Sequence, residues 1–137
     1  MVKNNPLISV LVCNYNYAQF IDEALNSLLR QDYANLEVVI VDDGSKDNSI
    51  QKINEFIKAN PQLNIHLKAK KLNQGLSYAR NDAIELSKGE YFIFFDSDDI
   101  MPPNYISQMF KTATKHDADV VYGDVRSFGD ANWQTTS

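Results

Sequence analysis

The chain has 137 residues, of which 44% are hydrophobic and 23% charged, and its net charge is −5. This composition suits one soluble globular domain and excludes a disordered or repetitive protein. Residues 90–137 carry eight acidic and three basic residues, whereas residues 1–89 carry ten of each, and an acidic second part argues against nucleic acid as a partner. We expect a cytoplasmic protein for three reasons. The sequence has a single cysteine, Cys13; it has no signal peptide; and it has no apolar stretch of about 20 residues.

Apolar runs and helical periodicities alternate along the chain. Strands are predicted at residues 6–13, 36–41, 63–67, 91–95 and 119–123. Helices are predicted at about residues 18–31, from about residue 47 to the stop at residues 60–61, and at residues 76–87 and 103–116. This alternation predicts an α/β fold with three layers, α/β/α, and a mostly parallel Rossmann-like sheet. Residues 132–137 are polar and are expected to fray.

The run at residues 91–95 is followed at once by three carboxylates, Asp96, Asp98 and Asp99. A continuous apolar run is typical of a strand buried on both faces of a parallel sheet, and ligands bind beyond the carboxyl ends of such strands. Crowded carboxylates repel one another unless a cation shares them, and oxygen ligands suit Mg²⁺ or Mn²⁺. The alternative is that Asp98 or Asp99 caps the helix that follows.

Polar residues end three of the predicted strands, at residues 13–16, 42–45 and 96–99. A parallel sheet brings these ends to one edge, and three polar ends in one crevice are harder to explain by capping than any single one. Asp42 and Asp43 are either turn residues, and then mostly solvated, or acceptors for a nucleobase or ribose. Tyr15 is either a half-exposed aromatic or a stacking platform for a base. Arg80 is either a surface residue or, if it faces the crevice, a partner for pyrophosphate or a loop carboxylate.

Two phosphate-binding motifs are missing from the sequence. It has neither Gly-x-x-x-x-Gly-Lys-[Ser/Thr] nor Gly-x-Gly-x-x-Gly after the first strand, which argues against a P-loop NTPase and a dinucleotide dehydrogenase. A nucleotide diphosphate would then need a metal to neutralise it, and Asp96 and Asp98 offer a site. We interpret the segment that contains Lys68, Lys70 and Lys71 as a solvated loop. From spacing alone, Cys13, His66 and His116 are interpreted as structural.

Four segments together resemble family 2 glycosyltransferases of the GT-A fold: residues 8–16 (ISVLVCNYN), 41–45 (VDDGS), 73–81 (NQGLSYARN) and 96–99 (DSDD). The resemblance spans about residues 7–123. It implies transfer of a sugar from a nucleotide-sugar donor, commonly a UDP-sugar, to an acceptor hydroxyl, with Mn²⁺ or Mg²⁺ as cofactor. Inverting transfer in polysaccharide or glycan biosynthesis is the expected role.

The resemblance also assigns roles to single residues. The first loop, which contains Cys13 and Tyr15, corresponds to the loop that contacts the nucleobase in family members. Asp43, with Asp42 beside it, matches the family's uracil-recognising pair. The implied substrate-binding residues are Cys13, Tyr15, Asp42, Asp43, Asn73, Gly75, Arg80, Asp96 and Ser97. The implied metal ligands are Asp96, Asp98 and Asp99. Asp98 is the implied catalytic residue, acting through the metal.

The chain departs from the family pattern in two ways. Cys13 and Asn14 stand where the family usually has Pro-Thr or Pro-Ala. Family members also continue into an acceptor-binding part with a carboxylate general base, whereas residues 128–137 contain only Asp130. We therefore expect residues 1–137 to be a nucleotide-sugar-binding GT-A domain, truncated before that part and inactive in transfer by itself. A glycan or lipid-linked acceptor would bind the missing part, the full-length protein could work at the inner membrane face, and the exposed sheet edge could self-associate.

Two other functions stay open at this point. A sugar-nucleotide pyrophosphorylase or nucleotidyltransferase uses a related sheet and metal, but it usually has a Gly-rich, Arg-containing loop after the first strand. The loop at residues 14–17, Asn-Tyr-Asn-Tyr, does not supply one. The other alternative is a non-catalytic nucleotide-binding module.

Overall fold

The computed structural model describes residues 4–130 and 133–135. Its elements, in chain order, are β1 (Ile8–Asn14), α1 (Ala18–Leu29), β2 (Leu36–Asp42), α2 (Ser49–Ala59), β3 (Asn64–Ala69), α3 (Leu76–Leu86), β4 (Tyr91–Asp96) and α4 (Tyr105–His116). All four helices and the first four predicted strands are therefore confirmed, with ends that differ by a few residues.

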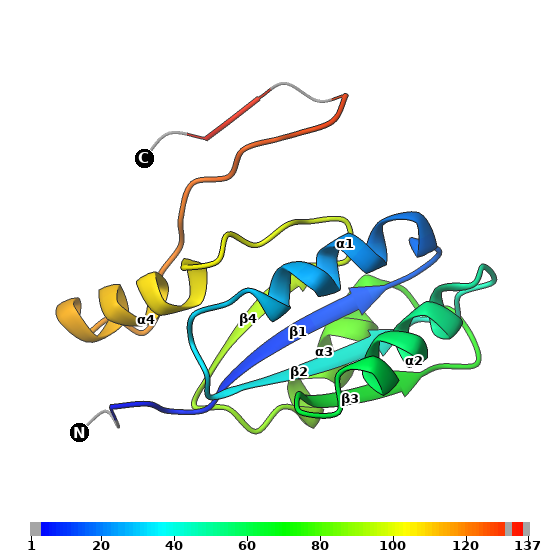
Figure 1. The fold of residues 1–137 in the computed structure, drawn as a ribbon, viewed down its shortest axis with the longest axis horizontal. Coiled ribbons are helices and arrows are strands. Elements are labelled where there is room, and N and C mark those ends of the chain that lie inside the picture. The colour runs from blue at the N-terminus through cyan, green and yellow to red at the C-terminus, as the bar shows by residue number, and fades with distance from the viewer. Residues whose placement is uncertain (1–3, 131–132, 136–137) are drawn as a thin grey trace.

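The four strands form one parallel sheet in the order β3-β2-β1-β4. Helices α1 and α2 lie in front of this sheet and α3 lies behind it (Figure 1). The predicted three-layer α/β/α architecture is thus confirmed. In the central strand β1, Cys13 lies beside Val41 of β2 and Asp96 of β4, so the carboxyl ends of these three strands meet at one edge of the sheet.

Strand side chains alternate between two cores. Val10 and Val12 of β1 face one core, which α1, α2 and α4 complete with residues such as Ile21 and Ile53. Leu11 and Cys13, at alternate positions of β1, face the second core, which α3 completes with small alanines. This period of two is what a strand requires, and each fully buried aliphatic side chain contributes roughly 1.5–3 kcal/mol.

One face of β4 departs from the prediction of a strand buried on both faces. Phe92 is 50% and Phe94 38% exposed, whereas Phe95 on the opposite face is buried. The physical reason is position: among the described residues β4 is an edge strand, and α3 packs on β1 and β2 rather than over β4. Phe92 and Phe94 therefore pack edge-to-face against each other on an open surface, with ring centroids 5.3 Å apart.

The predicted fifth strand at residues 119–123 is wrong for the part of the chain that the structure describes. This segment is irregular there, and Val120 and Tyr122 are largely exposed. A strand needs a neighbour that pairs with its backbone groups, and the sheet contains only β1 to β4. Within the tail that was expected to fray, Gln134 forms an isolated antiparallel bridge with Arg126; residues 132, 136 and 137 lie outside the described residues.

Candidate functional site

A crevice of about 280 Å³ lies where the carboxyl ends of β1, β2 and β4 meet the start of α3. We call it the acidic crevice; its lining residues are Cys13, Asn14, Tyr15, Tyr17, Asp43, Leu76, Ala79, Asp96, Ser97 and Asp98. Six of these were predicted as site residues: Cys13, Tyr15, Asp43, Asp96, Ser97 and Asp98. The parallel topology brings them together from positions up to 85 residues apart in the sequence, between Cys13 and Asp98.

Asp42 lies behind the wall of the acidic crevice rather than on it. Its side chain is fully buried and accepts hydrogen bonds from the Ser45 backbone N–H (2.9 Å), the Ser45 hydroxyl (2.6 Å) and the Asn14 amide Nδ2 (2.8 Å). Asn14, which sequence reasoning did not single out, lines the crevice in its place. Asp42 is therefore positioned to orient Asn14.

Asp43 is also buried, so the expectation of a mostly solvated turn residue is wrong. Its carboxylate accepts hydrogen bonds from the backbone N–H of Gly75 at 2.7 Å and of Gln74 at 3.1 and 3.2 Å. The ammonium of Lys70 lies 2.8 Å from Asp43 Oδ1, and the two side chains are 7% and 4% exposed. The interpretation of Lys70 as part of a solvated loop is therefore also wrong.

The charge of Asp43 is maintained by these neighbours. Burial by itself would raise the pKa of the Asp43 carboxyl, but Lys70 and the Gln74 and Gly75 N–H groups outweigh burial and hold this pKa below its usual value. In return, the bond to Asp43 raises the pKa of Lys70 above its usual value, although burial opposes this. Both groups are therefore ionised at neutral pH.

Close packing of two loops explains where Asn73 and Gly75 lie. Gly44 has a φ of +79°, and a Cβ added there would lie 2.8 Å from the Asn73 backbone nitrogen, so no other residue fits without strain. This contact and the Asp43 bonds hold residues 72–75 against residues 42–45. Asn73 and Gly75 therefore border the crevice without lining it, and Gly75 starts α3.

Arg80 projects from α3 toward β4. Its guanidinium lies 5.1 Å from the centre of the Phe94 ring, and Nη2 lies 3.5 Å from Asp96 Oδ1. This is one long contact, not a bidentate pair, and the side chain is more than one-third exposed. Arg80 Nε is buried and has no hydrogen-bond partner within the described part of the chain. Arg80 thus contacts Asp96, but it is not among the residues that line the acidic crevice.

Asp96 and Asp98 line the acidic crevice, and Asp99 lies directly beyond them. Burial, and then the charges of Asp98 and Asp96, raise the pKa of Asp99. The capping alternative is wrong, because α4 begins at Tyr105 and its N-cap residue is Asn104.

No group of three or more His, Cys, Asp or Glu side chains in the described residues is placed to hold a metal ion by itself. Two carboxylates beside an open crevice nevertheless fit Mg²⁺ or Mn²⁺. Mg²⁺ in particular is usually held by one or two carboxylates and completed by water and phosphate oxygens. The residues present therefore fit a metal that arrives with a diphosphate.

Among the other lining residues, Ser97 supplies a hydroxyl, Cys13 a thiol, and Tyr15 and Tyr17 aromatic rings. The Ser97 hydroxyl is buried and has no hydrogen-bond partner in the described residues. Burial raises the pKa of the Cys13 thiol to about 11; Arg80 lowers this pKa, and Asp96, Asp43 and Asp82 raise it. The thiol is therefore neutral at physiological pH. The Tyr15 ring is partly exposed at the mouth of the crevice, where it can stack on a planar ligand.

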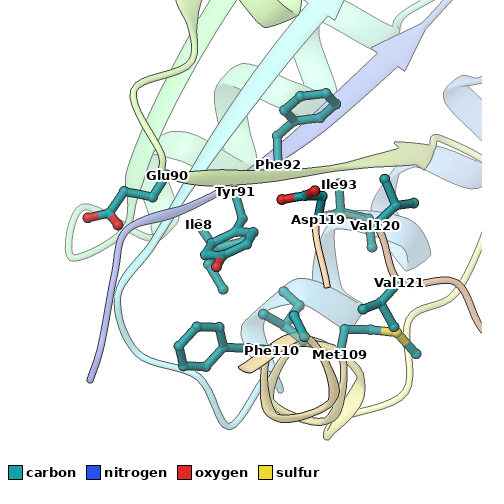
Figure 2. A pocket seen from close by; sticks show the side chains of 12 residues that line it. Ile8, Glu90, Tyr91, Phe92, Ile93, Met109, Phe110, Asp119, Val120 and Val121 are labelled. Atoms are coloured by element: carbon teal, nitrogen blue, oxygen red, sulfur yellow. The ribbon is translucent and has the colours of Figure 1, made fainter. Parts of the chain in front are cut away.

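A larger hollow of about 380 Å³ lies between β4, α4 and residues 119–121, away from these groups. We call it the apolar groove. Figure 2 shows Tyr91 and Phe110 on opposite sides of it, with ring centroids 5.9 Å apart. Most of its lining is aliphatic or aromatic, and its carboxylates are those of Glu90 and Asp119. Sequence reasoning placed no site residue in this groove.

Comparison with known proteins identifies the family of this chain. The family model described as "Glycosyl transferase family 2" matches residues 9–137. The glycosyltransferase GlyG of Streptococcus pneumoniae is 35% identical over 128 residues, which cover 93% of this chain and 42% of GlyG. An uncharacterised glycosyltransferase of Haemophilus influenzae is 35% identical over 116 residues, which cover 85% of this chain and 35% of that protein. The chain thus spans less than half the length of these relatives.

Two solved structures share the fold. S. aureus TarS 1–349 in complex with UDP has a TM-score of 0.73 and 34% identity, and the match covers 80% of this chain and 32% of that one. The mannosyltransferase PcManGT from Pyrobaculum calidifontis, in complex with GDP-Man and Mn²⁺, has a TM-score of 0.73 and 30% identity, covering 90% of this chain and 35% of that one.

In the described part of this chain, no helix has the length and apolarity needed to cross a membrane.

Proposed function

From the premise that the chain belongs to glycosyl transferase family 2, we propose that it binds a UDP-sugar donor in the acidic crevice. The observation that carries this proposal is the convergence of Tyr15, Asp43, Asp96 and Asp98, from the ends of three strands, on one open crevice. Ligands of open α/β sheets bind at such an edge. The solved complexes of TarS with UDP and of PcManGT with GDP-Man and Mn²⁺ support a nucleotide-sugar as the ligand.

The nucleoside would bind at the β1 and β2 side of the crevice. The Tyr15 ring would stack on the base, and the buried carboxylate of Asp43 would accept a hydrogen bond from a ring N–H. In this arrangement Cys13, Asn73 and Gly75 border the base and ribose. Asp42 would act through Asn14, to which it is hydrogen-bonded at 2.8 Å, and not by direct contact.

The diphosphate would lie at the β4 side. Asp96 and Asp98, with Asp99 next to them, would hold Mn²⁺ or Mg²⁺. When bound, the metal stabilises the negative charge that develops on the departing nucleoside diphosphate. The Arg80 guanidinium and the Ser97 hydroxyl offer donors to phosphate oxygens, since Arg80 Nε and Ser97 Oγ have no hydrogen-bond partner in the described residues. Asp98 is the residue we assign to catalysis, through the metal.

For the whole protein we propose inverting transfer of the sugar to a hydroxyl of a glycan or lipid-linked acceptor, in polysaccharide or glycan biosynthesis. Residues 1–137 would form the donor-binding GT-A domain, and the acceptor site and general base would belong to further chain. Loss of a general base alone slows such a reaction by about 10²–10⁴-fold, so residues 1–137 by themselves are expected to bind donor without efficient transfer. A cytoplasmic location and self-association through the open edge of β4 belong to the same proposal.

Calorimetric titration of UDP into the chain tests the donor and metal roles together. With Mn²⁺ present we expect binding, and with EDTA the affinity is expected to fall strongly, because the diphosphate and the Asp96 and Asp98 carboxylates then repel each other. Equal affinities in the two buffers would remove the metal from the proposal, and no binding in either would remove the nucleotide.

A further inference from the structure

Lys70 is a buried lysine that the function proposed above does not use. It follows β3, and its side chain is 7% exposed. Its ammonium lies 2.8 Å from Asp43 Oδ1 and 3.7 Å from Asp82 Oδ2. Buried lysines are uncommon unless paired, because the charged group loses its hydration. The position of Lys70 therefore requires Asp43 beside it, and Asp43 in turn lines the acidic crevice.

Three groups hold the Asp43 carboxylate in place. An ionised carboxylate has about four lone-pair sites. The Gln74 N–H is shared by both oxygens, the Gly75 N–H donates to Oδ2, and the Lys70 ammonium forms an ion pair with Oδ1. All three groups come from residues 70–75, the segment between β3 and α3. Since the Gln74 N–H is one donor shared over contacts of 3.1 and 3.2 Å, a ligand donor would take up one half of this shared contact.

We propose that Lys70 is a positioning residue that keeps Asp43 an oriented, ionised acceptor and thereby makes the crevice select a nucleobase that presents an N–H donor. The proposal rests on the proposed function, in which Asp43 meets the base. A carboxylate accepts hydrogen bonds only, whereas a protonated carboxyl can also donate. The charge state of Asp43 therefore decides whether uracil, with a ring N–H, is preferred over cytosine, whose ring nitrogen at that position is an acceptor.

The surrounding charges agree with this role. The groups near the pair are Asp82 on α3, whose carboxylate lies 3.7 Å from the Lys70 ammonium, and the Cys13 thiol on β1. Lys68 on β3 is 2.9 Å from Asp82 Oδ1 and so balances that carboxylate. Lys70 is thus the cation that touches Asp43 among the described residues. Without it, burial would raise the pKa of Asp43 with only the Gln74 and Gly75 N–H groups to oppose it.

Lys68 provides a matched control. It lies two residues before Lys70 and forms an ion pair with the same Asp82 rather than with Asp43, and its side chain is 43% exposed. Lys68→Met and Lys70→Met remove the same charge from the same segment. Only Lys70→Met removes the neighbour of Asp43, so the difference between the two variants isolates the action through Asp43.

The test is the ratio of the affinities for UDP and CDP, measured by calorimetry with Mn²⁺ at neutral pH. The two ligands share ribose, diphosphate and metal, so effects at Asp96 and Asp98 cancel in the ratio. We expect Lys70→Met to reduce the preference for UDP by about tenfold, Lys68→Met to leave it unchanged, and Lys70→Arg, which keeps the charge, to restore part of it. Circular dichroism establishes that each variant is folded.

A Lys70→Met variant that is folded but keeps the wild-type ratio would overturn this proposal and leave the proposed function intact. Wild-type chain that binds neither nucleotide would overturn the proposed function itself. If Lys70→Met does not fold, the wild-type ratio decides: it should stay constant from about pH 8 to about pH 6, because a paired Asp43 remains ionised there. A wild-type preference that declines over this range would overturn the role of Lys70.

Discussion

The acidic crevice and the apolar groove both border β4, but they are lined by different kinds of side chain. The crevice lies beyond the carboxyl end of the strand, and its polar side chains come from the ends of β1, β2 and β4. The groove lies along the side of β4, is larger, and is lined mostly by apolar residues of β4 and α4. In this fold, strand direction rather than cavity size determines where the polar side chains suited to ligand binding lie.

The two regions also differ in the groups around them: buried charged side chains at the crevice, and exposed aromatic rings beside the groove. At the crevice, Asp43, and Asp42 behind the wall, are buried and accept hydrogen bonds from neighbouring residues. Beside the groove, Phe92 and Phe94 leave an open apolar surface. Changes in the crevice should therefore alter both stability and ligand binding, whereas changes beside the groove should alter neither strongly.

Replacement of the buried carboxylate should have the largest effect. Asp43→Ala leaves Lys70 buried without its partner, and removal of one partner of a buried ion pair costs about 3–5 kcal/mol. We expect the free energy of unfolding, measured by urea denaturation, to fall by about this amount. Asp22→Ala is the control, because Asp22 forms an equally short ion pair with Lys52, 2.7 Å, but is 54% exposed. The control should lose at most about 1 kcal/mol, and equal losses in both variants would contradict the burial argument.

Replacement of a metal-binding carboxylate should separate the two hollows by function. Asp98→Asn is expected to weaken UDP binding in Mn²⁺ by at least the roughly 10–100-fold that loss of an outer-shell partner costs a metal site. Asp119→Asn removes the same charge from the lining of the apolar groove and should leave the affinity unchanged. Calorimetry measures both, and equal losses would show that overall charge, rather than the crevice, determines binding.

Stability should depend on pH through the same buried groups. The pKa of Asp43 lies below its usual value, so its contribution is fully present above the unfolded-state pKa of about 3.9 and is lost as pH falls through the folded-state value. The pKa of Lys70 is raised, so its contribution is present below about pH 10.4 and is lost as pH rises through its folded-state value. Urea denaturation across pH should show a plateau between these limits. A decline that already begins near neutral pH would contradict it.

The smallest effect is expected beside the apolar groove. Phe92→Lys places a charge on a half-exposed face of the edge strand, where charged residues suppress edge-to-edge pairing. We expect the variant to be as stable as wild type within about 0.5 kcal/mol, to bind UDP equally well, and to self-associate less in sedimentation experiments. Self-association that Phe92→Lys leaves unchanged would remove this face as its cause.

Local sequence patterns predicted most of the fold. Apolar periodicity was sufficient to predict the four strands and four helices, because the apolar residues of each element follow the period of that element. Two predictions failed for non-local reasons. The run at residues 91–95 contains Phe92 and Phe94 on a face that α3 does not cover. Residues 119–123 have strand-forming side chains but, in the described structure, no strand to pair with.

The candidate site was predicted in its parts but not in its supporting contacts. Tyr15, Asp43 and Asp96 could be found because polar residues ended apolar strands. Lys70 could not, because a lysine among three in a polar segment is usually solvated, and only the fold brings it to Asp43. Asn14 was adjacent to predicted residues, but its amide bond to Asp42 depends on the pairing of β1 with β2.

The central claim is that a nucleotide and its metal bind at the acidic crevice and not in the apolar groove. Mn²⁺ is paramagnetic and broadens the NMR signals of nearby backbone amides, so a titration of the isotope-labelled chain with UDP and Mn²⁺ locates the ion directly. We predict that signals of Asn14, Tyr15, Ser97 and Asp98 broaden first, whereas those of Val120, in the groove, stay sharp. Broadening centred on the groove, or no UDP-dependent broadening at the ends of β1 and β4, would contradict the account.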